Sequence, residues 1–263
     1  MGKRLYQVSW YKCKNFFLCL QITILILQMR FQKVQLYLSP SRIERFQIAT
    51  GYQSSKSVKL YKANLKISQS FHPILGILEV ILRNKINIIL AGYFADSDWI
   101  INQKNGFMID PSLTYRDHRA RRIVTNDYLK TSVEKSENRF RRIRIPVTSG
   151  KIIADQTLGF WTNLFELSHY RILRGRPIQI FNHLPSGIGR IQVCDRLNKI
   201  REFRNRINHN EPICFNGNNI DFNYVEDVYN SIIQIINWID PELINWIKDM
   251  DSVMIKISNA KRI

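Results

Sequence analysis

The chain has few cysteines, few acidic residues and no apolar run long enough to cross a bilayer. Its four cysteines form no CxxC pair, and no histidine stands at zinc-ligand spacing around them. We therefore expect neither a structural zinc site nor a disulfide framework, but free thiols in a reducing cytoplasm. The apolar run at residues 16–27 is interrupted by Gln21 and Thr23 and is shorter than the roughly 20 residues that a bilayer requires.

Basic residues far outnumber acidic ones, and the surplus is regional. The formal net charge is +18 over 263 residues. Residues 116–144 hold ten Lys/Arg against four Asp/Glu, whereas residues 218–263 hold four against seven. A hydrophobic fraction of 45% rules out a disordered chain, so the charge belongs to a folded protein. The charge alone could reflect only a bias towards solubility. Because the surplus is unevenly placed, we instead expect it to attract a polyanion, and we expect that partner to be nucleic acid.

Residues 1–34 differ from the remainder and are interpreted as an N-terminal extension. Lysines and arginines precede the apolar run, but no small-residue cleavage site follows it, as a signal peptide would require. Three interpretations remain: a membrane anchor within residues 1–28, a first core helix, or translated upstream sequence. We favour the last, with Met29 as the start, and therefore expect a cytoplasmic protein; membrane association is the alternative.

The body of the chain, residues 35–258, shows helical periodicity almost throughout and no internal repeat. It predicts an all-α fold. Ser39 and Pro40 mark one helix start, His72 and Pro73 another, and Asp240 with Pro241 a third. Trp99 is expected to point inward from an irregular segment. The predicted helical ranges are 41–49, 58–71, 74–90, 115–144, 152–173, 189–209, 223–238 and 241–257.

The segment 74–90 is apolar almost all round, which predicts a central buried helix. Its polar exceptions, Glu79, Arg83 and Asn87, are four residues apart and share one face, and Asn84 lies beside them. One interpretation is a solvated stripe with a Glu79–Arg83 ion pair worth about 0.2–0.5 kcal/mol. The other is a polar stripe that faces a functional site. Composition alone favours the first.

The helix predicted at 189–209 carries the most informative residues. Its apolar stripe consists of Val193, Leu197, Ile200, Phe203 and Ile207. Arg204 follows Ile200 by one helical turn and so lies at the inward edge of that stripe, where a guanidinium needs an anionic or polar partner. Asn205 and His209 share a face at the helix end, and Pro212 is expected to stop the helix.

An arginine, an asparagine and a histidine at one helix end suit cleavage of RNA through its 2′-hydroxyl. That reaction needs proton transfer, which His209 can supply near neutral pH, and a cation for the phosphate, which Arg204 can supply in a bidentate way. No metal ion or cofactor is needed, and no carboxylate cluster offers a metal site. Taken alone, the Arg-x4-His spacing is a weak signal, and a helix-ending histidine beside a surface arginine is then the favoured interpretation.

The residues around this pair carry a more specific pattern. Residues 204–213 read RNRxxHxEPI, which closely resembles the active-centre signature of the Abi-like (abortive infection) family within the HEPN superfamily. Four further stretches match the same family in order, so that the resemblance covers roughly residues 36–250. These are Leu38–Ile43, Leu78–Asn84, Leu158–Phe165 and Trp238–Pro241.

The resemblance implies an HEPN-type helical bundle with additional helices, in which two Arg-His motifs meet in a homodimer. It implies a metal-independent endoribonuclease used in phage defence or as a toxin, with Arg204 and His209 catalytic and Asn205 supporting. If the protein is a toxin of this kind, an antitoxin is a possible partner. The expected target is RNA, and no specificity for a DNA sequence is expected. Glu79, Arg83 and Asn84 fall in a matching stretch and are expected to border the site.

The basic region 115–144 has no counterpart in the resemblance, so a role for it in RNA binding rests on its charge alone. Interleaved aromatic residues favour contacts to RNA backbone and bases, although such a run is most often a solvated face. The predicted RNA-binding residues are Arg119, Arg121, Arg122, Arg141 and Arg142. The alternative function is a non-catalytic HEPN module that binds RNA or a partner protein through this surface.

Overall fold

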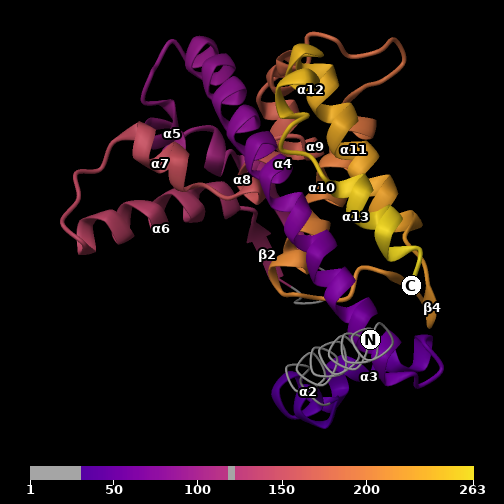
Figure 1. Cartoon of the computed structure of the whole chain (residues 1–263). Helices are drawn as coiled ribbons and strands as arrows, with labels where there is room; N and C mark the ends of the chain where they lie inside the picture. The colour runs from indigo at the N-terminus through magenta and orange to yellow at the C-terminus, as the bar shows by residue number, and fades with distance from the viewer. Residues whose placement is uncertain (1–30, 118–121) are drawn as a thin grey trace, which may run out of the picture. The chain divides into compact units, whose positions relative to one another are not determined.

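The computed structural model describes residues 31–117 and 122–263, and the expected N-terminal extension at residues 1–30 lies outside them. Twelve α-helices make up most of the described residues, with 71% helix against 5% strand. The prediction of a mostly helical fold is therefore confirmed (Figure 1). No helix in the described part of the chain is both long and apolar enough to cross a membrane.

The chain divides into two compact units, of which the smaller includes residues 31–63 and 216–220. It contains α2 (Phe31–Leu38), α3 (Pro40–Ala49), the beginning of α4 and the strand β4 (Asn219–Ile220). Its core includes the fully buried Ile43 and the rings of Phe46 and Tyr61, whose centroids are 5.2 Å apart. Ser39 stands at the N-cap of α3 as predicted, but its side chain makes no capping bond.

The helix α4 (Ser54–Phe94) is continuous over 41 residues, so the predicted break at His72 and Pro73 is wrong. Phe71 and Ile74 are both fully buried on either side of Pro73, and packing of this face keeps the helix intact. The expectation of burial all round is also wrong. Leu78, Leu82, Ile86 and Leu90 are fully buried on one face, whereas Val80 and Ile88 are exposed on the other.

The larger unit, residues 64–215 and 221–262, continues with irregular structure and a hairpin. Trp99 is fully buried, as predicted. The predicted helical range 115–144 is partly wrong, because its first part forms an antiparallel hairpin of β1 and β2 in which Thr114 pairs with Thr125. Only the second part is helical. The elements are α5 (Trp99–Asn102), η1 (Gln103–Asn105), η2 (Phe107–Ile109), η3 (Pro111–Leu113), β1 (Thr114–Asp117), β2 (Arg122–Thr125) and α6 (Tyr128–Arg142).

Three short helices follow where one helical segment, 152–173, was predicted. They are α7 (Ser149–Asp155), α8 (Leu158–Asn163) and α9 (Leu167–Ile172), and the 3-10 helix η4 (Arg176–Ile180) comes next. The aromatic cluster predicted to lie in the core does so, since Phe160, Trp161 and Phe165 are all fully buried. Phe160 and Trp161 belong to α8, and Phe165 lies in the short connection between α8 and α9.

The helix with the Arg-His motif, α10 (Arg190–Asn208), has nearly its predicted bounds and packs against α8 and α11 (Figure 1). After it come β3 (Phe215–Asn216), α11 (Asn223–Ile239), α12 (Glu242–Ile247) and α13 (Val253–Ala260). The single helix predicted at 241–257 is thus two helices. The N-cap residue of α12 is Pro241 and not the predicted Asp240, whose Oδ1 nevertheless accepts a hydrogen bond from the Glu242 amide at 2.9 Å.

Candidate functional site

The apolar stripe of α10 determines which of its side chains remain accessible. All five predicted stripe residues are buried, and the Phe203 ring packs on Phe71 of α4 with centroids 4.6 Å apart. The helix ends at Asn208, and His209 is its C-cap, with its amide donating to the Asn205 carbonyl at 3.1 Å. Pro212 therefore lies beyond the end of the helix rather than ending it.

Arg204 has the anionic partner that its position requires. Its Nη2 donates to Oε2 of Glu79 on α4 at 3.4 Å. The side chains are 30% and 19% exposed, so this pair lies at the edge of the core and not within it. Glu79 uses one guanidinium nitrogen, and a guanidinium has five N–H donors, which leaves others for a phosphate.

The remaining polar residues of α4 do not join Arg204. Arg83 donates from Nη1 to the Ala154 carbonyl at 3.1 Å, and Asn87 accepts from Trp99 Nε1 at 2.8 Å. Asn84 is exposed. The predicted stripe thus serves three different neighbours, and Glu79 pairs with Arg204 instead of with Arg83. Of the α4 residues predicted to border the site, the structure brings Glu79 to the motif.

Asn205 and His209 are both exposed and lie one helical turn apart at the end of α10. Neither side chain makes a hydrogen bond or an ion pair to any residue that the structure describes. Both side chains can therefore reach a ligand without first breaking an internal contact. With Arg204 one position before Asn205, a guanidinium, an amide and an imidazole are presented at one helix end.

The loop after His209 is held by residues that sequence reasoning missed. Asn64 of α4 is 1% exposed, and its Oδ1 accepts from the Ile213 amide at 2.8 Å while its Nδ2 donates to the Glu211 carbonyl at 3.5 Å. Arg206 Nη2 donates to the Pro212 carbonyl at 2.6 Å, and its Nε lies 3.3 Å from the Glu211 carboxylate. Glu211 and Pro212 of the motif therefore contact Arg206 and have a structural role.

The predicted RNA-binding arginines are not gathered in one place. Arg122, Arg141 and Arg142 are exposed, and Arg141 lies 3.6 Å from Glu137. Arg122 precedes α6 and the other two end it, and the 15 residues of α6 span about 22 Å at about 1.5 Å per residue. Arg119 and Arg121 lie outside the described residues.

A second histidine, His169 on α9, is unsuited to proton transfer with a substrate. Its side chain is fully buried, and neither ring nitrogen has a hydrogen-bond partner in the described chain. Burial lowers the pKa of His169 to about 4, against the nearby Glu166, which raises it. The exposed His209 is therefore the better placed of the two.

No group of three or more His, Cys, Asp or Glu side chains in the described ranges is arranged to hold a metal ion. Comparison with protein-family models, with curated proteins and with solved structures found no match.

Proposed function

We propose that the chain is an HEPN-type endoribonuclease of the Abi-like kind, with Arg204 and His209 as its catalytic pair. The observation that carries the proposal is their placement. Arg204 is oriented by Glu79 at the core edge, and the exposed Asn205 and His209 follow it at the same end of α10. A binding site for a large substrate requires side chains that are held in place, as Arg204 is by its ion pair, and side chains that the substrate can reach, as Asn205 and His209 are.

In the proposed reaction, the 2′-oxygen of a ribose attacks the adjacent phosphorus atom and the bond from phosphorus to the 5′-oxygen breaks. The 2′-hydroxyl proton passes to a base and a proton passes from an acid to the 5′-oxygen. The products are a 2′,3′-cyclic phosphate and a 5′-hydroxyl. His209 performs one of these transfers, and in a homodimer the partner's motif performs the other.

Arg204 stabilises the charge that develops on the phosphate oxygens. The ion pair with Glu79 holds the guanidinium in place, so little reorganisation is needed when the substrate binds. Asn205 is proposed to donate its amide to the same phosphate or to the ribose. The proposal requires no metal ion, and cleavage is therefore expected to persist in EDTA.

The test uses purified full-length protein, wild type and His209→Ala, with a labelled single-stranded RNA. Wild type should produce fragments that end in a 2′,3′-cyclic phosphate, and His209→Ala should produce fewer by about 100-fold or more, the usual contribution of a general acid or base. The matched control is His183→Ala, because His183 is also an exposed histidine but lies outside the motif. Its rate should equal that of wild type.

The biological role proposed is phage defence or a toxin held in check by an antitoxin. The alternative is a non-catalytic module that binds RNA or a protein, for which the exposed Arg122, Arg141 and Arg142 provide positive charge. The same assay separates the two functions. A module of that kind would bind the labelled RNA, leave it intact and be unaffected by His209→Ala.

A further inference from the structure

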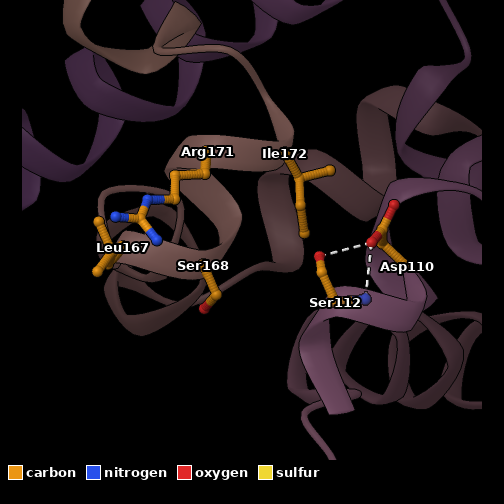
Figure 2. A pocket seen from close by; sticks show the side chains of 6 residues that line it. All are labelled: Asp110, Ser112, Leu167, Ser168, Arg171 and Ile172. Carbon is orange, nitrogen blue, oxygen red and sulfur yellow. Dashed lines mark hydrogen bonds between the residues drawn. The ribbon is translucent and has the colours of Figure 1, made fainter.

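A cleft of about 650 Å³ lies in the larger unit between α9 and η3, and no residue of the Arg-His motif lines it (Figure 2). Its volume falls within the range of about 300–1,000 Å³ that is usual for small-molecule sites. α9 contributes most of the lining, and the η3 side contributes an acidic and a hydroxyl group. The lining residues are Asp110, Ser112, Leu167, Ser168, Arg171 and Ile172.

The α9 wall of the cleft carries a cation with no partner in the described chain. Arg171 is exposed and makes no hydrogen bond or ion pair to any residue there. Ser168 precedes it by three residues, so their side chains lie on the same face of α9. An unpaired guanidinium beside a hydroxyl is suited to a phosphate, which takes several charge-assisted hydrogen bonds.

The η3 wall carries an oriented carboxylate. Asp110 Oδ1 accepts from the Ser112 amide at 2.9 Å and from the Ser112 hydroxyl at 2.6 Å, as the dashed lines of Figure 2 show. These bonds lower the pKa of Asp110, so the carboxyl group is ionised near neutral pH. Its Oδ2 has no partner within the described ranges, and it can accept N–H donors from a ligand.

Apolar atoms complete the lining. Leu167 is 44% exposed and Ile172 is half-buried, and together they offer a surface for the flat face of a base. A cation would be repelled by Arg171 and a dicarboxylate by Asp110. An amino acid would match both charges but would leave most of the volume unfilled.

We propose that this cleft binds one guanine nucleotide, with its phosphate on Arg171 and Ser168 and its base edge on Asp110. Guanine presents two adjacent donors, N1–H and the exocyclic amino group, to a carboxylate. Uracil presents a single N–H between two carbonyl oxygens, which the carboxylate repels. The nucleotide is either free or part of an RNA. The assignment to an RNA rests on the proposed ribonuclease function.

The first measurement is calorimetric titration of the full-length protein with GMP and with UMP into the millimolar range. GMP should bind more tightly than UMP. Arg171→Ala should weaken GMP binding by about tenfold or more, as expected for loss of a charge-assisted contact. Asp110→Asn keeps an acceptor for Ser112 but should abolish the preference for GMP. Arg262→Ala removes an exposed arginine outside the cleft and should change nothing.

The second measurement uses fluorescein-labelled, guanine-containing RNA and the variant His209→Ala, which prevents cleavage. If the site holds a nucleotide of RNA, GMP should displace the RNA and Arg171→Ala should weaken its binding. If it holds a free nucleotide, RNA binding should be insensitive to both.

Absence of GMP binding, or binding equal in wild type and Arg171→Ala, overturns the proposal whether or not the wild type cleaves RNA. If GMP binds but no RNA is cleaved, the cleft is still a guanine-nucleotide site and only the ribonuclease function is contradicted.

Discussion

Replacing Asn64 with alanine should destabilise the larger unit and loosen the loop that follows His209. The Ile213 amide, on a residue that is 1% exposed, would lose its acceptor at 2.8 Å, and the Glu211 carbonyl would lose a weaker donor at 3.5 Å. An orphaned buried donor costs about 1–3 kcal/mol, so we expect a loss of about 2 kcal/mol in the free energy of unfolding. At about 2–4 °C per kcal/mol, the melting temperature should fall by about 4–8 °C.

The assay is urea unfolding followed by circular dichroism, supported by a thermal melt. Ser68→Ala is the matched control, because Ser68 is a buried polar residue of the same helix, and among the described residues its hydroxyl bonds only to the Asn64 carbonyl. It leaves no orphaned donor on another segment and should cost about 0.5–1.5 kcal/mol at most. If Asn64→Ala is no more destabilising than Ser68→Ala, Asn64 does not hold the loop.

Three further predictions concern other parts of the larger unit. A double-mutant cycle with Glu79→Gln and Arg204→Gln, read by urea unfolding, should give a coupling energy of about 0.5–1 kcal/mol, as befits a partly exposed pair; a value of zero contradicts the contact. Because the unfolded chain protonates His169 near 6.5 and the folded chain only near 4, the free energy of unfolding should fall as pH drops through this interval, and His169→Phe should reduce that loss. Burial and the nearby Glu166 raise the pKa of Cys194 to about 11, so iodoacetamide should label it at neutral pH only after unfolding, as mass spectrometry of its peptide would show.

The motif helix was predictable because its apolar stripe is periodic. The stripe from Val193 to Ile207 places Arg204 at the core edge, and the need of that guanidinium for a partner followed from the cost of burying a charge. Identification of the partner did not follow. Glu79 is 125 residues away from Arg204 in sequence, and helical spacing favoured Arg83 as the partner of Glu79.

The errors arose where local signals competed with packing. A proline usually marks the start of a helix, but Pro73 lies inside α4, where buried residues on both sides of it hold the helix together. The hairpin was missed because its arginines dominated the interpretation, although Thr114, Ile123, Val124 and Thr125 are β-branched and favour strands. Asn64 gave no signal of its role, because a single polar residue in a helix is indistinguishable from a solvated one until its tertiary neighbours are known.

The central claim is tested most directly by induced expression of wild type and His209→Ala in growing cells, with His183→Ala as the matched control and total RNA run on a gel. The proposed ribonuclease predicts growth arrest and fragmented RNA for wild type and for His183→Ala, but normal growth and intact RNA for His209→Ala at equal protein levels. Intact RNA in cells that contain folded wild-type protein, with or without phage challenge, would contradict it.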